Sequence, residues 1–199
     1  MIASQISKLE SCQKQCLSLG ITADGQPRPS LGVPWESTTS AFNMCIPDLY
    51  LAPEDTQDSA LLERLGAFEI LGCYIFTPLS DYRFLSRFPL LRDLYIEEGQ
   101  QLTSLAFARE LEELSMLFLE NAHLPDLTEA FPPERFSRIA HRCLGLYHCR
   151  IDCPEAISSP RTYFAELLIW PQLPDEQERL RWKQVHAGTF RYYQPRQKK

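Results

Sequence analysis

The sequence feature that most constrains the fold is a core of six residues that recurs through the middle of the chain. Each copy consists of an apolar anchor, two spacers, a second anchor, one spacer and a third anchor. The first four copies begin 22 or 23 residues apart. In an extended strand, residues two apart point to the same face, so the last two anchors of each copy lie together. The six copies begin at Ile46, Phe68, Leu91, Leu114, Leu144 and Phe164.

A unit of this length cannot bury its own apolar side, whereas stacked units bury a shared core. The copies resemble leucine-rich repeats, most clearly over residues 91–127, and the resemblance covers about residues 46–172. It implies an α/β fold: a right-handed solenoid with short parallel concave strands and helical or irregular convex segments. We expect irregular repeats, because the turn position that often holds Asn or Cys in the family holds neither in any copy. Those positions are Glu54, Phe76, Gly99, Ala122, Asp152 and Gln172.

The segments outside the repeats are expected to cap both ends of the solenoid. An apolar stripe from Ile2 to Leu17 predicts an N-terminal helix, and residues 20–41, rich in Gly, Pro, Ser and Thr, predict an extended arm. Asp175 is a candidate N-cap for a helix to about His186, and residues 189–193 predict a last strand. The prediction is one domain with an N-terminal cap and arm at 1–45, a solenoid at 46–172 and a C-terminal cap and tail at 173–199.

The connections between repeats also contain apolar residues at helical spacing. One such run spans residues 102–111, and the other spans residues 136–143 after Pro133, which suits the first turn of a helix. Both runs predict helical or half-helical segments on the convex side.

Charge and cysteine usage narrow the classes of function. Residues 48–129 contain 16 acidic and 5 basic residues, and the whole chain has a net charge of −6. A nucleic-acid reader is usually basic over its working face, so we expect no nucleic-acid partner. No apolar run approaches the ~18 residues that a membrane span requires, so no membrane partner is expected.

The seven cysteines, an odd number, and the missing export-type leader favour free thiols and a cytoplasmic protein.

One group of residues suggests chemistry, namely His141, Cys143, His148, Cys149 and Cys153. These side chains are of the types that bind zinc or form a Cys–His nucleophile. Their spacing matches no zinc-binding pattern, and in the repeat register Cys149 points inward while His148 points outward. Buried structural cysteines are therefore the preferred interpretation, and neither a metal nor a cofactor is expected. Cys12 and Cys16 are expected on one face of the first helix, in the core under the cap.

The repeat register also predicts which spacers line the concave face. The central column is Tyr50, Gly72, Tyr95, Phe118, His148 and Leu168, and the next column is Ala52, Tyr74, Glu97, Glu120, Arg150 and Trp170. Aromatic residues with a charged rim are typical of protein-binding patches. The candidate partner-binding residues are Tyr50, Tyr74, Tyr95, Glu97, Phe118, Glu120, His148, Arg150 and Trp170.

The resemblance and this face together predict a non-enzymatic module that binds a partner protein. Two alternatives remain open: a metal- or thiol-dependent enzyme that uses the His141–Cys153 cluster, and a structural subunit of an assembly. Two circumstances would undo the predicted face. One is that the N-terminal arm covers the face. The other is that the register slips by one residue, which would turn every one of these side chains inward.

Overall fold

The computed structural model of the chain is an α/β structure built on a single eight-stranded sheet in which all neighbouring strands are parallel. It describes residues 2–12, 15–27, 48–130, 143–157, 164, 166–173, 175–185 and 188–193. The strands of this sheet are β1 (Cys16–Ile21), β2 (Asp48–Leu51), β3 (Glu69–Ile75), β4 (Asp93–Ile96), β5 (Met116–Glu120), β7 (Cys143–Tyr147), β9 (Glu166–Trp170) and β10 (Thr189–Tyr192). A second, two-stranded sheet pairs β6 (His123–Leu124) with β8 (Arg150–Ile151).

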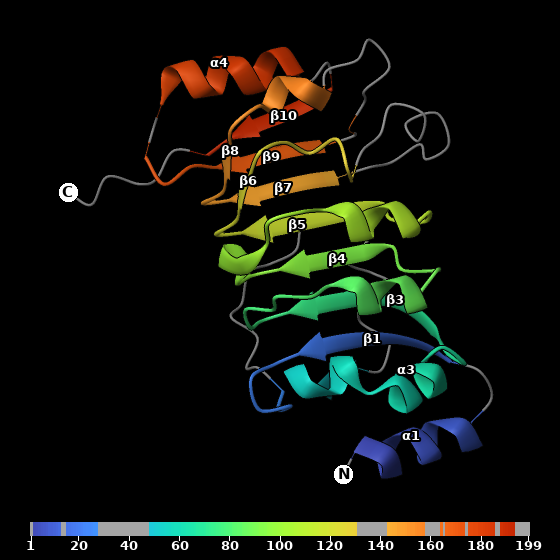
Figure 1. Cartoon of the computed structure of the whole chain (residues 1–199). Coiled ribbons are helices and arrows are strands. Elements are labelled where there is room, and N and C mark those ends of the chain that lie inside the picture. Colours follow the sequence, from blue (N-terminus) through green and yellow to red (C-terminus); the bar gives the residue numbers. More distant parts are fainter. Residues whose placement is uncertain are drawn as a thin grey trace.

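The strands lie in the order β10-β9-β7-β5-β4-β3-β1-β2 (Figure 1). From β3 to β10, each strand of the sheet lies beside the strand that precedes it in the chain. The other end differs, because β1 lies between β2 and β3 and leaves β2 at the edge. The sequence did not predict β1, which falls within the segment expected to be cap and arm.

The helices of the connections lie over one face of the sheet (Figure 1). The α-helices are α1 (Ile2–Ser11), α3 (Ser59–Leu65) and α4 (Glu176–Val185), and the 3-10 helices are η1 (Pro53–Gln57), η2 (Arg83–Arg87), η3 (Gly99–Gln101), η4 (Ala106–Glu110) and η6 (Pro154–Ile157). Asp58 and Asp175 act as N-caps of α3 and α4: Asp58 Oδ1 accepts a 3.0 Å hydrogen bond from Leu61 N–H, and Asp175 Oδ1 a 2.8 Å bond from Gln177 N–H. No helix among these described segments is both long and apolar enough to cross a membrane.

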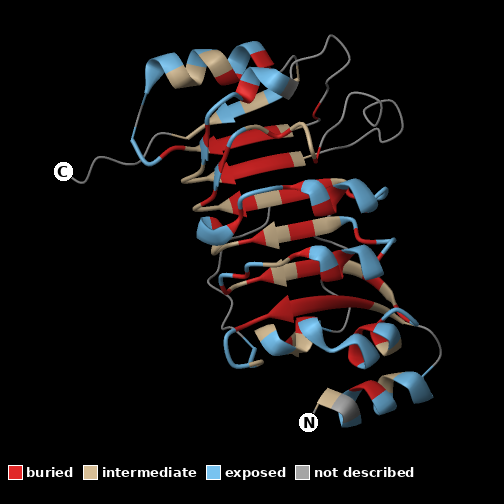
Figure 2. Ribbon diagram, viewed as in Figure 1, coloured by how far each residue is buried: buried red, intermediate tan, exposed pale blue. Residues whose placement is uncertain are grey.

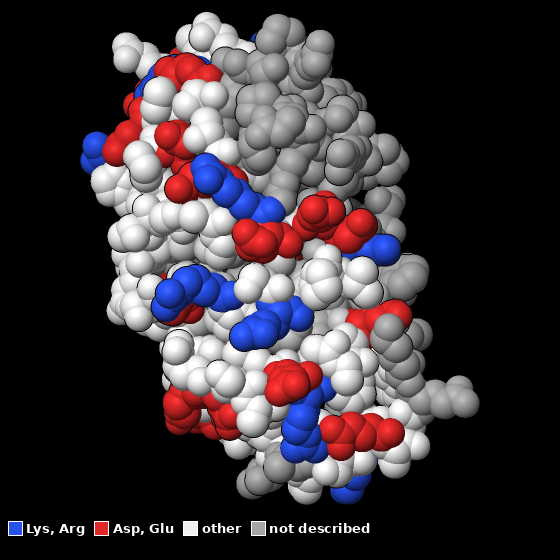
Figure 3. All heavy atoms as spheres, turned by 45° about the vertical axis from the view of Figure 1, so that its right-hand side comes forward, with Lys and Arg blue, Asp and Glu red and all other residues white. Residues whose placement is uncertain are grey.

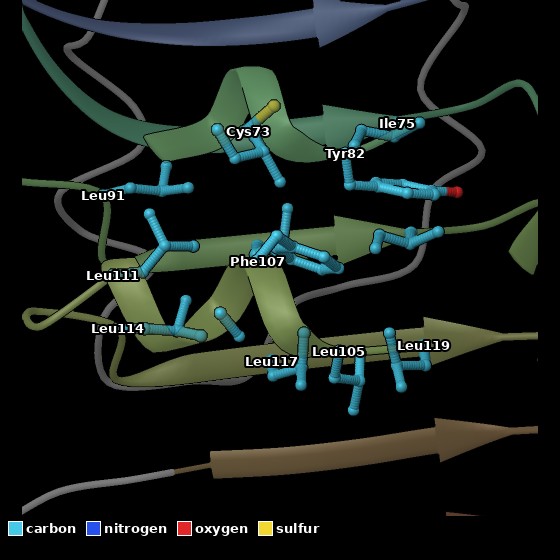
Figure 4. Packing of buried hydrophobic residues seen from close by; sticks show 14 of the residues in the cluster. Cys73, Ile75, Tyr82, Leu91, Leu105, Phe107, Leu111, Leu114, Leu117 and Leu119 are labelled. Carbon is cyan, nitrogen blue, oxygen red and sulfur yellow. The ribbon is translucent and has the colours of Figure 1, made fainter. Parts of the chain in front are cut away.

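Along β2 and β4 buried residues alternate with more exposed ones, whereas β1 is buried almost throughout (Figure 2). Leu94 and Ile96 of β4 pair with Leu117 and Leu119 of β5, and all four are at most 1% exposed. Side chains from the connection between these strands complete the core, with Leu105, Phe107, Leu111 and Leu114 packed beside the strand residues (Figure 4). The core therefore lies between the sheet and the helices.

The segment over 102–111, predicted as helical or half-helical, contains the 3-10 helix η4. Its predicted apolar residues Leu102, Leu105 and Leu111 are at most 2% exposed. A 3-10 helix rises about 2.0 Å per residue against about 1.5 Å for an α-helix, so it spans the sheet with fewer residues. Of the second predicted run, residues 136–142 lie outside the described residues, and Cys143 begins β7 instead of continuing a helix.

The predicted N-terminal helix is too long. It ends at Ser11, and Cys16 already belongs to β1, so Cys12 and Cys16 do not share a helix face. The residues of β1 alternate in character, with Leu17, Leu19 and Ile21 completely buried, and this period of two belongs to a strand.

Two repeat registers also differ from the prediction. In the second copy Cys73 and Ile75 pair with Leu94 and Ile96, two residues further along than predicted, so the anchor Cys73 still faces the core. The predicted anchor Leu71 lies at a register shift between β1 and β3 and is half-buried, and Ile70 is buried in its place. In the fifth copy Leu144 and Leu146 pair with Leu117 and Leu119, although Tyr147 and Cys149 were predicted as the last two anchors. This shift of three residues exchanges the faces. It was missed because Tyr147 and Cys149 are apolar enough to satisfy the pattern themselves.

Candidate functional site

The sheet face turned away from the helices, here called the outer face, is lined by aromatic residues. Tyr74, Tyr95 and Phe118 occupy directly paired positions on β3, β4 and β5. Two residues further along their strands lie Phe76, next to Tyr95, and the paired residues Tyr147 and Trp170. We call the aromatic strip the set Tyr74, Phe76, Tyr95, Phe118, Tyr147, Trp170 and Tyr193, all of which are half-buried.

The rings of the strip contact one another without a break across six neighbouring strands or their ends. The ring centroids of Tyr95 and Phe118 are 5.7 Å apart, and those of Phe118 and Trp170 are also 5.7 Å apart. Trp170 stacks on Tyr193 at 4.3 Å with an interplanar angle of 4°. The remaining contacts are Tyr74–Phe76 at 6.4 Å, Phe76–Tyr95 at 6.4 Å and Tyr147–Trp170 at 6.1 Å.

Glycines on the neighbouring strands make room for these rings. Gly145 of β7 pairs with Phe118, and a Cβ at Gly145 would lie 2.3 Å from the Phe118 ring. Gly20 of β1 pairs with Tyr50 of β2, and a Cβ there would lie 2.4 Å from the Tyr50 ring. The Phe118 and Tyr50 rings therefore each cover a glycine on the adjacent strand and shield backbone that would otherwise be open to water.

Carboxylates lie along both margins of the aromatic strip. Glu97 directly follows β4 and Glu120 ends β5, and Tyr95 Oη donates a 3.0 Å hydrogen bond to Glu120 Oε2. At the amino ends, burial raises the pKa of Asp48 and of Asp93, and for Asp93 the nearby Arg92 offsets part of this shift. The outer face thus combines apolar rings with acidic groups.

Seven of the nine residues predicted to bind a partner lie on this face. They are Tyr50, Tyr74, Tyr95, Glu97, Phe118, Glu120 and Trp170, although the corrected register places Tyr74 in the row of Tyr95 rather than in the next one. Phe76, Tyr147 and Tyr193 were missed. Gly72, Tyr74 and Phe76 follow one another at a spacing of two. A predicted register two residues further along would have placed Phe76 on the outer face with Tyr74.

His148 and Arg150 are corrections to the predicted face. His148 follows β7 in a left-handed conformation with φ of 52°, and its N–H donates to the Trp170 carbonyl at 2.7 Å. Its ring contacts Tyr147 at 4.1 Å, so it borders the strip without belonging to the predicted column. Arg150 belongs to the two-stranded sheet, where its Nε is 2.9 Å from Asp152 Oδ1. Both misplacements follow from the shift of three residues in the fifth copy.

The cysteine and histidine cluster is spread along β7 and the turn after it. Cys143 begins the strand and His148 follows its end, which separates them by roughly 16 Å. Burial raises the pKa of both Cys143 and Cys149 to about 12, and Cys149 Sγ donates to the Leu119 carbonyl at 3.2 Å. His141 lies outside the described residues. Among those that are described, no three His, Cys, Asp or Glu side chains are placed to hold a metal ion.

Comparison with known proteins gives no family and no relative. No family model matches the chain, and neither the curated proteins nor the solved structures contain a match to it.

Proposed function

We propose that the chain is a leucine-rich-repeat-like solenoid that binds a partner protein through its outer, concave face and does no chemistry of its own. The repeat length supports the solenoid. Between β3 and β10, paired residues of successive strands in the sheet lie 21, 23, 27, 23 and 23 residues apart in the chain. One strand and one return over the core therefore make up each repeat, as in quasi-one-dimensional repeat proteins.

The two ends suit capping roles. Beyond β1, α1 contacts α3, and Arg64 of α3 forms a 3.0 Å ion pair with Glu10 of α1. At the other end, α4 contacts η6 and buries Trp182, which is 2% exposed. Terminal repeats of a solenoid need such covers, because they have a neighbour on one side only.

The observation that carries the binding function is the unbroken contact among the rings of the aromatic strip. Aromatic side chains bring a large contact area at a low cost in conformational entropy, and they are enriched at the centres of protein interfaces. A face that met only water would be served by polar residues, and extended apolar surface usually serves recognition.

The enzyme alternative has less support from the described residues. A thiol-dependent enzyme needs a thiolate, and thiolates form at helix N-termini or beside cations, where the thiol pKa is lowered. Cys143 and Cys149 have a pKa of about 12 instead. The alternative of a structural subunit predicts a permanent oligomer, which sedimentation velocity at nanomolar concentration would detect.

The test is capture of partners from a lysate of the source cells with two matched double variants. Tyr95→Arg/Phe118→Arg places two cations in the aromatic strip. Gln101→Arg/Thr103→Arg adds the same charge at exposed positions in the β4–β5 connection. Circular dichroism establishes that both variants fold.

We expect a partner captured by the wild type to be retained by the control and lost from the strip variant. Equal capture by all three proteins would overturn the proposal. Equal loss of the partner from both variants would show that binding responds to added positive charge at any position. It would also contradict binding through the outer face.

A further inference from the structure

The outer face has a marked excess of negative charge at its strand positions. We count the charged residues that point to this face from a strand of the sheet or from the position directly after a strand. Among the described residues, six of these are acidic and one is basic. The acidic residues are Asp48, Glu69, Asp93, Glu97, Glu120 and Glu166, and the basic residue is Arg191 at the terminal strand. Even Arg191 lies near an acid, because its Nη2 is 3.4 Å from Glu166 Oε1.

The helical side of the molecule differs in its charge pattern. Figure 3 shows acidic and basic groups interspersed over the surface that it displays, without a patch of one sign. Arg64 pairs with Glu10 at 3.0 Å, Arg83 with Asp81 at 2.7 Å and Arg181 with Glu155 at 2.8 Å. Outside the outer face the described residues include 18 acidic and 10 basic side chains, against six and one on the outer face, so the acidic excess is proportionally larger on the outer face.

The acidic groups follow the aromatic strip on both of its long sides. Asp93 and Glu166 lie at the amino ends of β4 and β9, whereas Glu97 directly follows β4 and Glu120 ends β5. Asp48 begins β2, beyond the six strands of the strip, and extends the acidic character of the face toward that edge of the sheet. The hydrogen bond from Tyr95 Oη holds Glu120 beside the rings. A ligand that lies along the strip crosses the strands and meets rings beneath it and carboxylates at either margin.

We propose that the partner docks on the aromatic strip with an extended segment rich in arginine or lysine. This inference rests on the proposed function and specifies the chemistry of its partner. The aliphatic stems of such side chains pack on ring faces while their charged heads reach the margins. Cations are attracted to the faces of Trp and Tyr rings, and guanidinium groups form charge-assisted hydrogen bonds with carboxylates. Complementary charge also speeds the encounter and disfavours acidic competitors.

The proposal predicts that a generic cationic peptide binds in the absence of the natural partner. The probes are two fluorescein-labelled peptides of twelve residues, one of alternating Arg and Ala and one of alternating Glu and Ala. Fluorescence anisotropy measures their binding to the full chain at 50 and 200 mM NaCl. We expect the Arg peptide alone to bind, and its affinity to fall at the higher salt concentration.

Matched variants locate the binding site. Glu97→Gln/Glu120→Gln removes two charges from the margin and keeps an amide oxygen that can accept the Tyr95 hydrogen bond. Glu110→Gln/Glu112→Gln removes the same charge from exposed positions on the helical side. We expect the first pair to weaken binding of the Arg peptide at least about tenfold and the second pair to change it less than about twofold. Thermal melting shows that both variants fold.

The outcomes separate this inference from the proposed function. Equal weakening by both pairs, equal binding of both peptides, or binding of neither peptide overturns the cationic partner. If Tyr95→Arg/Phe118→Arg still abolishes capture of the natural partner in that case, the face binds a partner of different chemistry and the proposed function stands. If capture is also unaffected, both proposals fail.

Discussion

The ring of Phe118 on β5 lies directly over Gly145 on β7. The two residues are paired in the sheet, and a Cβ at position 145 would lie 2.3 Å from both Cε2 and Cζ of Phe118. The same ring is 5.7 Å from Tyr95 on one side and 5.7 Å from Trp170 on the other. The absence of a side chain at Gly145 therefore sets the position of the ring that links the two halves of the aromatic strip.

Gly145→Ala is expected to push the Phe118 ring off its site. We expect a loss of roughly 1 kcal/mol in the free energy of unfolding, because the overlap costs more than the entropy gained by replacing a glycine. Urea denaturation of Gly145→Ala, Phe118→Ala and the double variant measures the coupling energy between the two positions. An equal loss in the Phe118→Ala background would show that the ring is not what the added methyl group meets.

The register of β7 can be tested with two adjacent residues. Leu146 is 2% exposed and Tyr147 half-buried. Leu146→Ala should cost about 2–4 kcal/mol of unfolding free energy through the cavity it leaves, and Tyr147→Ala under about 1.5 kcal/mol. Chemical denaturation measures both values. The reverse order would restore the register predicted from the sequence, in which Tyr147 is the inward anchor.

The thiols should fall into two reactivity classes. Cys12 and Cys153 are exposed, whereas Cys143 and Cys149 are half-buried and the loss of water around their thiols raises the pKa of both to about 12. At pH 8 only about one in 10⁴ of these two thiols is ionised to the thiolate, which is the form that attacks iodoacetamide and displaces iodide. A short pulse of iodoacetamide followed by peptide mass spectrometry should modify Cys12 and Cys153 first. Fast modification of Cys149 in the folded protein would revive the enzyme alternative.

Asp93 should destabilise the fold at neutral pH. Burial raises the pKa of its carboxyl above the ordinary value of an aspartate in the unfolded chain. Between that value and the raised one, the native state binds more protons than the unfolded state, so stability falls as the pH increases. Asp93→Asn should therefore raise the Tm at pH 7 by about 1–3 °C, and the gain should vanish below pH 4.

Calorimetry from pH 3 to pH 7 tests the effect of Asp93, with Glu112→Gln at an exposed position as the control. A gain that persists unchanged at pH 3 would mean that charge is not the cause. A destabilised Asp93→Asn protein at pH 7 would mean that the carboxylate is favoured in the fold.

The capping role proposed for α4 rests on Trp182, which can be removed. Trp182→Ala should lower the free energy of unfolding by about 3–5 kcal/mol, because it leaves a cavity where α4 packs against the last repeats. In a solenoid that stacks its repeats in series, the loss is local, so amide exchange should accelerate in β9 and β10 before β3 and β4. Hydrogen exchange read by mass spectrometry distinguishes this from uniform acceleration across all strands, which would contradict stacking in series.

The sequence by itself determined the period of the fold and most of its inward-facing residues. The copies that begin at Leu91 and Leu114 were assigned the correct anchors, because period-two alternation and a repeat of 23 residues are local patterns. Asp175 and the last strand at 189–192 were likewise found from short-range signals. Six of the nine predicted partner-binding residues, from Tyr50 to Glu120, came from the same alternation, and Trp170 from the sixth copy.

Tertiary structure alone decided which strands are neighbours and which side chains meet. The insertion of β1 between β2 and β3 joins residues some fifty positions apart, such as Leu19 and Cys73. The position of Tyr147 between Glu120 and Trp170 depends on the pairing of β7 and not on its own sequence, which fits either register. Alternation is encoded within one strand, whereas pairing is chosen by the fit of distant surfaces. For that reason Trp170 and Tyr193 were found stacked only once the strands were in place.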